Sequence, residues 1–183
     1  MEKPRAFARF LARLLRLSGI LEQSSGVQIE IDAVDLEILD WLQRDATLGQ
    51  AVIGNRVGLS AAAVNRRITR MTNAGLIVRT TAVLDPELLG HGITLIVQIE
   101  VESEQPEALH MTEATFTSDI HIQQCYYVTG EADFILVVTV RSMNEYSELT
   151  KKLFFANNNV RKFKTYVVMQ RAKVGLTVPL SKE

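Results

Sequence analysis

The residues with the clearest chemical potential lie between positions 58 and 71, where small side chains are followed by three arginines. Gly58 suits the left-handed conformation that ends a helix, and Ser60 supplies an oxygen that can cap the next helix. At about 100° per residue, the apolar positions of that next helix share one face. They are Ala61, Val64, Ile68 and Met71. Two helices joined by a tight glycine turn, the second with a basic outer face, predict a helix-turn-helix.

The outer face of the second helix is expected to contact DNA. Small side chains at its start let a helix enter the major groove, and arginines further along can reach phosphates or guanine edges. The residues expected to contact DNA are Ser60, Ala62, Ala63, Asn65, Arg66, Arg67, Thr69 and Arg70. The alternative is a surface helix whose basic face is only solvated. Gly54 favours the helix-turn-helix, because a mid-helix glycine costs about 1 kcal/mol relative to alanine and so indicates a close helix–helix approach.

Two helices are expected before the arginine-bearing helix. Asp32 suits the N-cap of the first, and Asp35 in its first turn suits the positive end of the helix dipole. The apolar stripe of this helix comprises Leu36, Ile38, Leu39 and Leu42. Trp41 lies beside that stripe and is expected to pack at its rim. Thr47 and Gln50 have the spacing of a capping box, which predicts the start of the second helix.

A wing and a hinge are expected next. Gly75 ends the third helix, and residues 76–84 are rich in β-branched side chains, which predicts a strand. This strand would complete a winged helix-turn-helix domain over residues 29–84. An Asp-Pro pair then interrupts the pattern, and residues 85–92 contain two glycines, which indicates a hinge.

Residues 93–183 are expected to form the α+β part of the chain. Strand patterns cover residues 93–102, 120–128, 134–140 and 160–170. One helix opens at Pro106, and a second follows Ser142, whose capping-box partner is Glu145. The order β-α-β-β-α-β is that of a ferredoxin-like βαββαβ domain. One face of its sheet carries no helix, and we expect that face to pair with another subunit.

Residues 1–28 stand apart from both units. They predict a basic amphipathic helix, with arginines on one side, followed by a short linker that contains serines and a glycine. We interpret this arm first as a segment that packs on a partner subunit or is dispensable. The alternatives are a membrane-surface helix, a transit peptide, a DNA-contacting arm, or a translation start assigned too far upstream.

The composition is that of an ordinary globular protein, with 183 residues of which 47% are hydrophobic and 22% charged. The net charge of −1 means that DNA binding must come from a local patch. Cys125 is the single cysteine, which excludes an internal disulfide and suits a reducing compartment. We expect it to be a buried structural thiol. No apolar run approaches the ~20 residues that span a bilayer, so a cytoplasmic protein without a transmembrane segment is expected.

Both units together resemble the Lrp/AsnC ("feast/famine") family of transcriptional regulators, over about residues 29–180. The segments that carry the resemblance are 31–39, 56–60 with 64–68, 84–90, and 125–133. The sequence departs from the family at Ala61, where a proline is usual, and in its N-terminal arm. The resemblance implies a regulator that binds double-stranded DNA, forms a homodimer and associates further, to a tetramer or an octamer.

The resemblance also implies an effector, an amino acid or related small metabolite, bound between subunits near a Gly-x-x-Asp turn, and no other cofactor. The corresponding residues are Thr129, Gly130, Glu131, Ala132 and Asp133. Amides around Gly130 could hold a carboxylate, and Asp133 could hold an ammonium group. The alternative is a plain hairpin turn in which the glycine supplies a positive φ.

Two alternative functions stay open. Some relatives of this fold decarboxylate haem precursors, so a tetrapyrrole decarboxylase-like enzyme is one of them. However, His91, His110 and His121 show no metal-binding spacing and no Ser-His-Asp set is recognisable, so we expect no catalytic or metal site. The histidines are interpreted as surface or capping residues. The other alternative is an effector-sensing protein that does not act on DNA, which buried arginines in the third helix would favour.

Overall fold

The computed structural model describes residues 29–180, in which there are two compact units. One comprises residues 29–83 together with 173–180, and the other comprises residues 84–172. The arm and linker expected over residues 1–28 lie outside the described residues. Residues 173–180 thus group with the helical unit, although the sequence pattern placed them in the α+β domain.

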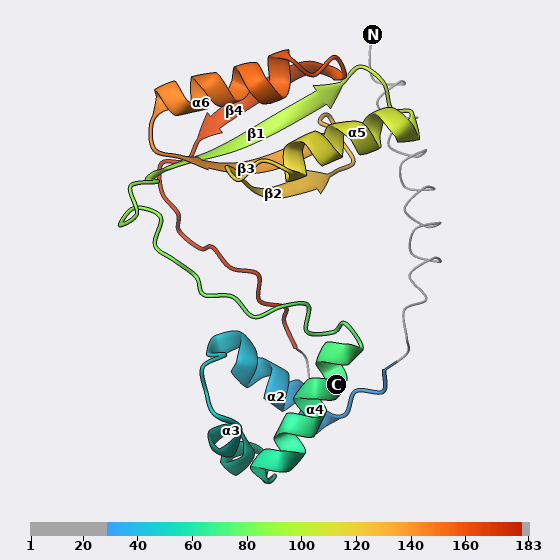
Figure 1. Ribbon diagram of the computed structural model, residues 1–183, viewed down its shortest axis with the longest axis vertical. Helices are drawn as coiled ribbons and strands as arrows, with labels where there is room; N and C mark the ends of the chain where they lie inside the picture. The colour runs from blue at the N-terminus through green and yellow to red at the C-terminus, as the bar shows by residue number, and fades with distance from the viewer. Residues whose placement is uncertain (1–28, 181–183) are drawn as a thin grey trace. The chain divides into compact units, whose positions relative to one another are not determined.

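The helical unit is built from α2 (Ala33–Arg44), α3 (Gln50–Val57) and α4 (Ala61–Asn73), as Figure 1 shows. Its core consists of four fully buried side chains that come from all three helices. They are Ile38, Ile53, Val64 and Met71. Ile68 packs against the same core, so the apolar face predicted for α4 is confirmed apart from Ala61. Ala61 is exposed in the first turn of α4.

Local capping interactions define where α2 and α4 begin. The Asp32 carboxylate accepts from the Asp35 N–H at 2.8 Å, and the Asp35 carboxylate accepts from the Asp32 N–H at 3.2 Å. This reciprocal pair is a capping box. Ser60 Oγ accepts from the Ala63 N–H at 3.2 Å at the start of α4. Gly58 ends α3 with a φ of 71°. The roles predicted for Asp32, Ser60 and Gly58 are therefore confirmed.

The turn between α3 and α4 requires the glycine at position 54. A Cβ atom on Gly54 would lie 2.4 Å from the carbonyl oxygen of Leu59. The Leu59 N–H donates to the Gly54 carbonyl at 2.9 Å. The close approach predicted for Gly54 exists, but its partner is the turn leading into α4 rather than the body of another helix.

Two expectations for this unit are wrong. Gly49, not Thr47, is the N-cap of α3, because Thr47 donates its N–H and its hydroxyl to Asp45 Oδ1, at 2.9 and 2.6 Å. The strand and wing predicted over residues 76–84 are also absent from the described chain. The sheet within residues 29–180 contains four strands, all from the other unit, so residues 76–84 have no strand with which to pair their backbone groups.

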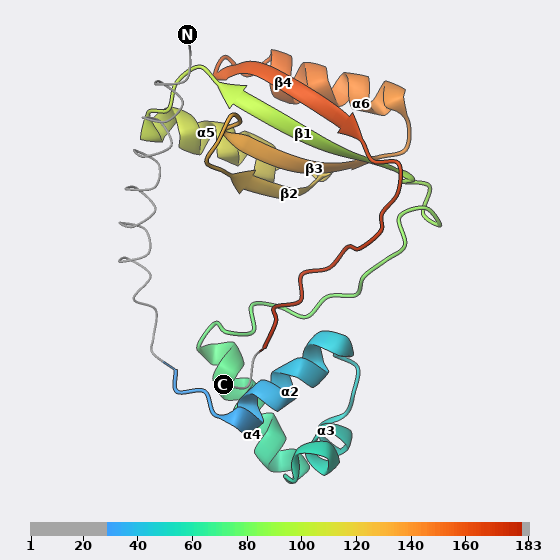
Figure 2. The same cartoon turned by 180° about the vertical axis from the view of Figure 1, so that it is seen from behind.

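The α+β unit has the element order predicted from the sequence. Its elements are β1 (Ile93–Val101), α5 (Pro106–Thr117), β2 (Ile122–Tyr127), β3 (Phe134–Val140), α6 (Met143–Thr150), the π-helical turn η1 (Lys151–Phe155) and β4 (Val160–Val167). The strand order is β2-β3-β1-β4, and all neighbours are antiparallel. Figures 1 and 2 show α5 and α6 on the same face of the sheet. This is the ferredoxin-like arrangement, and only the ends of β1, β2 and β4 differ from expectation.

The core of this unit lies between the sheet and its two helices. Leu95, Val97 and Ile99 of β1 are fully buried, as expected for alternate residues that share one face of a half-buried strand. The Phe116 ring of α5 meets the Phe134 ring edge-on, with centroids 5.7 Å apart. The aromatic packing therefore fixes α5 against β3.

Candidate nucleic-acid interface and effector turn

Helix α4 presents the predicted DNA-contacting residues at or near the surface. Six of the eight are exposed, and the remaining two, Ala63 and Arg67, are half-buried. The arginines of α4 are therefore not buried, and the condition that would favour a DNA-independent protein is not met.

Arg67 and Arg70 are anchored to the start of α2. The fully buried Asp35 carboxylate accepts from Arg67 Nη1 at 2.8 Å and also pairs with Arg70 Nη2. Arg67 Nη1 lies 2.7 Å from Asp32 Oδ2, and Arg70 Nη1 donates to the Glu30 carbonyl at 3.1 Å. Hydrogen bonds to Asp35 and Asp32 raise the pKa of Arg67. The sequence pattern placed Arg70 on the outer face of α4 and Arg67 on its flank, and it did not predict this cluster.

Arg66 differs from its two neighbours. Its side chain is exposed, and within residues 29–180 it takes part in none of the ion pairs of the helical unit. Asn65 and Thr69 are exposed on the same helix. Arg66 is thus the arginine of α4 whose charge is not already neutralised by a carboxylate of the described chain.

Trp41 joins α2 to α3 through a cation–π contact. The guanidinium carbon of Arg56 lies 3.8 Å from the centroid of the Trp41 ring. Arg44 approaches the same ring at 5.5 Å. Because Arg56 stands in the last turn of α3, this contact supports the helix that precedes the turn. The sequence had indicated only a packing role for Trp41.

The predicted effector turn connects β2 to β3 and is tied to β1. Gly130 has a φ of 132°, which residues with a side chain rarely adopt. Asp133 is buried, and its Oδ2 accepts from the Val101 N–H at 2.6 Å. The Asp133 N–H donates to the Ile99 carbonyl at 2.7 Å, and its carbonyl accepts from the Val128 N–H at 2.9 Å. Asp133 therefore holds the turn against the end of β1, a role that the sequence did not reveal.

The remaining residues of the turn differ in exposure. Gly130 and Glu131 are exposed, Thr129 is half-buried and Ala132 is buried. The accessible part of the turn is consequently its tip, at Gly130 and Glu131.

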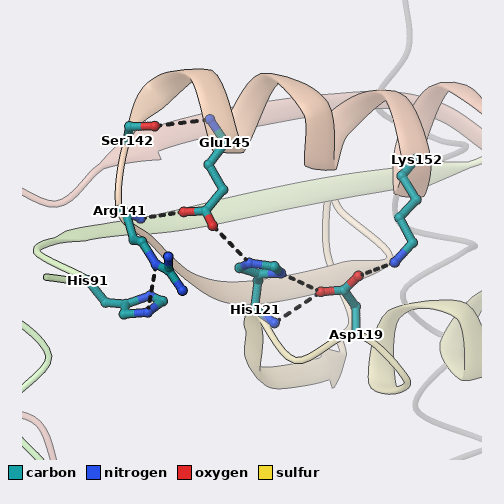
Figure 3. Close-up of polar contacts among 7 residues, drawn as sticks. All are labelled: His91, Asp119, His121, Arg141, Ser142, Glu145 and Lys152. Carbon is teal, nitrogen blue, oxygen red and sulfur yellow. Dashed lines mark hydrogen bonds and ion pairs between the residues drawn. The ribbon is translucent and has the colours of Figure 1, made fainter. Parts of the chain in front are cut away.

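A polar network that the sequence did not predict surrounds His121, as Figure 3 shows. His121 Nδ1 lies 2.8 Å from Asp119 Oδ1, and Nε2 lies 3.4 Å from Glu145 Oε1. Lys152 Nζ donates to Asp119 Oδ2 at 2.8 Å. The Arg141 N–H donates to Glu145 Oε2 at 2.6 Å. The expectation that His121 is an isolated surface or capping residue is therefore wrong.

The same network reaches His91 and the start of α6 at one end, opposite the end at Lys152 (Figure 3). Arg141 Nε donates to His91 Nε2 at 3.2 Å (Figure 3). Ser142 Oγ accepts from the Glu145 N–H at 3.2 Å and caps α6 as predicted. The capping box is only half formed, because the Glu145 carboxylate accepts a hydrogen bond from the Arg141 N–H instead of the Ser142 N–H.

Two carboxyl groups of the network have lowered pKa values. Burial by itself raises the pKa of Asp119, but hydrogen bonds from Lys152 and His121 outweigh it and bring the pKa to about 2. The Arg141 N–H, followed by His121, lowers the pKa of Glu145. Both groups are therefore ionised at neutral pH, and they act as hydrogen-bond acceptors.

Within residues 29–180, no group of three His, Cys, Asp or Glu residues is arranged so that it could hold a metal ion. Cys125 is half-buried, and burial together with the nearby charge of Glu113 raises its pKa to about 11. A thiol with such a pKa is almost entirely protonated at neutral pH, which agrees with a structural role. None of the helices in the described part of the chain is long and apolar enough to cross a membrane.

A helix-turn-helix with an exposed basic helix, followed by a ferredoxin-like domain, defines a two-domain DNA-binding regulator. Residues 31–72 match the AsnC-type helix-turn-helix domain, and residues 94–178 match the Lrp/AsnC ligand binding domain. The chain belongs to the Lrp/AsnC family of transcriptional regulators, as its sequence motifs indicated.

Relatives cover most of the chain. An uncharacterized HTH-type transcriptional regulator of Sinorhizobium fredii, y4tD, is 34% identical over 83% of this chain and 90% of its own length. The leucine-responsive regulatory protein of Haemophilus influenzae is 32% identical over 78% of this chain and 86% of its own. Both relatives are named as regulators of transcription.

Solved structures share the fold. An AsnC family regulator from Agrobacterium tumefaciens superimposes with a TM-score of 0.77 and 30% identity, over 82% of this chain and 97% of that one. The Neisseria meningitidis regulator NMB0573, solved with L-Met, has the same TM-score and coverage but 24% identity. The second likeness shows the fold alone.

Proposed function

We propose that α4 is the DNA-recognition helix and that Arg66 supplies its principal charge contact. The observation that carries this proposal is the difference between the arginines, since Arg66 is exposed while Arg67 and Arg70 are engaged with Asp35. A guanidinium has five N–H donors, so Arg67 and Arg70 can add phosphate contacts while they remain anchored to α2. The small and polar members of the proposed surface are Ser60, Ala62, Ala63, Asn65 and Thr69.

We further propose that the protein works as a homodimer, in which two α4 helices meet successive major grooves roughly 34 Å apart. Residues 29–84 would bind DNA, residues 85–92 would act as a hinge, and residues 93–183 would carry oligomerisation and effector binding. The helix-free face of the sheet supports this, because it exposes Ile96 (38%), Tyr126 (47%) and Tyr166 (50%). We also propose that the dimer associates further, to a tetramer or an octamer, and that the protein works in the cytoplasm.

We propose an amino acid or a related small metabolite as the effector, at the turn formed by residues 129–133. The exposed tip at Gly130 and Glu131 supports this site, and so does the L-Met bound by the Neisseria regulator. Because Asp133 is bonded to the Val101 N–H, it serves first to position the turn. Effector binding would shift the balance between assemblies that present α4 differently. No catalytic activity is proposed.

Binding to DNA from upstream of the protein's own gene tests the first proposal, by fluorescence anisotropy at several salt concentrations. Arg66→Ala should lower the affinity about tenfold and reduce the salt slope by about one. If Arg66 reads a base, the variant should also lose discrimination at one position of the site. Arg171→Ala, an exposed arginine of the other unit, is the matched control. Equal binding by Arg66→Ala and wild type would contradict the assignment.

Calorimetric titration with each common amino acid tests the effector proposal. One or a few of these amino acids should bind, and they should change the DNA affinity in the anisotropy experiment. Gly130→Ala should weaken that binding because the φ of 132° is unfavourable for alanine. Gly90→Ala is the control, since Gly90 also has a positive φ, of 76°, but lies outside the turn. Equal loss in both variants would point to a general structural effect and against this site.

A further inference from the structure

The carboxylate of Asp32 occupies one side of Arg67, an arginine of the proposed recognition helix. Asp32 is the N-cap of α2, and its side chain is 51% exposed. Its Oδ2 lies 2.7 Å from Nη1 of Arg67, whose side chain is 29% exposed. A DNA phosphate binds a guanidinium through anionic oxygens, as a carboxylate does. A phosphate that approaches Arg67 at this side therefore meets a carboxylate already in place.

The two oxygens of Asp32 have different roles. Oδ1 accepts from the Asp35 N–H at 2.8 Å and caps α2, whereas Oδ2 pairs with Arg67. Hydrogen bonds from the Asp35 N–H and then from Arg67 lower the pKa of Asp32, so the carboxylate is ionised at neutral pH. Because the contacts are made by different oxygens, the contact with Arg67 can be exchanged while the cap stays formed.

Asp35 differs from Asp32 because its side chain is fully buried. Its Oδ1 lies 2.8 Å from Arg67 Nη1, and its Oδ2 pairs with Arg70 Nη2. Separating a buried carboxylate from its cations is costly, because water cannot replace them. An exposed pair contributes only about 0–1 kcal/mol. Asp35 is thus the lasting anchor of Arg67, and Asp32 is a partner that another anion can replace.

These four side chains form an ion cluster without net charge. Two carboxylates, Asp32 and Asp35, face two guanidinium groups, Arg67 and Arg70. Proteins gain affinity for DNA when their cations replace the counterions of the phosphates, and a cluster that is already neutral replaces few of them. Without the charge of Asp32, this flank of α4 would carry an excess of one positive charge.

We propose that Asp32 is an internal competitor of DNA for Arg67, so that a phosphate oxygen replaces Asp32 Oδ2 at Arg67 Nη1 when α4 binds. Asp35 holds Arg67 throughout this exchange, and the arginine is therefore positioned before DNA arrives. The competition lowers the affinity for all DNA sequences alike, because phosphates carry no sequence information. It leaves the groove contacts of α4 with a larger share of the affinity. This inference rests on the proposed role of α4 as the recognition helix.

The affinities for two duplexes of equal length, one from upstream of the protein's own gene and one of random sequence, test the inference at several salt concentrations. Asp32→Asn should tighten binding to both duplexes severalfold, by the same factor, and should steepen the salt slope by about one. Asparagine is as good an N-cap as aspartate, so the start of α2 is kept. Thermal melting checks the fold of each variant.

Two further variants separate the exchange from a general effect of charge. Asp40→Asn is the matched control, because it removes another exposed carboxylate of α2, which pairs with Arg44 at 2.7 Å. It should change the DNA affinity little. In an Arg67→Gln background, Asp32→Asn should no longer tighten binding, since the two residues act through one contact. A gain that persists without Arg67 would show plain repulsion between Asp32 and DNA and would overturn the exchange.

The remaining outcomes distinguish this inference from the proposed function. If wild type binds DNA, an unchanged affinity in Asp32→Asn, or an equal gain in Asp40→Asn, would overturn the inference alone. Wild type that binds neither duplex would overturn the proposed function, and the inference with it.

Discussion

The buried Asp35 carboxylate, at the start of α2, accepts a hydrogen bond from Arg67 of α4 at 2.8 Å. The same carboxylate pairs with Arg70. Asp35 thus ties α4 to the start of α2. Asp35 and Asp32 together pair with Arg67 and Arg70, which leaves Arg66 as the arginine of α4 that has no carboxylate partner in the described chain.

Asp35→Asn should destabilise the helical unit by about 3 kcal/mol. The reason is that the substitution removes the buried negative charge that pairs with the guanidinium groups of Arg67 and Arg70. Chemical denaturation, followed by the fluorescence of Trp41, measures the change. Asp40→Asn is the matched control, since Asp40 pairs with Arg44 at 2.7 Å on the surface, where such pairs contribute about 0–1 kcal/mol. Similar effects of the two variants would mean that Asp35 does not anchor α4.

Gly54→Ala should destabilise the protein although alanine is the better helix former by about 1 kcal/mol. The added Cβ would lie 2.4 Å from the Leu59 carbonyl oxygen, so the turn must move, at a cost of about 2 kcal/mol or more. The melting temperature and the DNA affinity should both fall. Gly49→Ala, with no atom within 4 Å of its Cβ, should stay within about 1 kcal/mol of wild type. A neutral Gly54→Ala would show that the turn is more adaptable than its geometry indicates.

Acid should destabilise the α+β unit through Asp119. Its folded pKa of about 2 lies below the ordinary value of 3.8, so the stabilisation is present above pH 4 and is lost as the pH falls towards 2. This difference corresponds to about 2 kcal/mol. Denaturation curves between pH 7 and pH 2 should therefore be less steeply pH-dependent for Asp119→Asn than for wild type. Lys152→Met should raise the pKa of Asp119 and shift the loss to higher pH. Identical pH profiles for all three proteins would exclude this role.

The side chain of Gln43 holds the C-terminal segment against α2. Its Nε2 donates to the Val178 carbonyl at 3.1 Å, and its Oε1 accepts from the Val178 N–H at 2.7 Å. Gln43→Ala should speed hydrogen exchange of the Val178 amide about tenfold, because each such bond contributes about 1 kcal/mol. Gln43→Glu keeps an acceptor for that amide and should give a smaller change. Unchanged exchange in Gln43→Ala would show that other contacts hold this segment.

Much of the fold follows from the sequence because its signals are local. Asp32, Gly58 and Ser60 cap or end helices through bonds that span at most a few residues, so their types and spacing suffice to predict them. Alternation in β1 shows which side chains are buried, because successive residues of a strand face opposite sides. A local pattern can also predict a strand wrongly, because a strand needs a neighbouring strand to pair its backbone groups. Residues 76–84 have strand-forming side chains, but no strand of the described chain pairs with them.

The sequence by itself determined the order of the helices and of the four strands, and it placed three arginines on α4. The tertiary structure alone decided which charges are available for binding. It pairs Arg67 with Asp35, Asp133 with the Val101 N–H, and His121 with Glu145. Hydrogen bonds and ion pairs depend on distances of a few ångströms, and for residues far apart along the chain only folding sets those distances. The periodicity of helices and strands in the sequence does not predict these long-range distances.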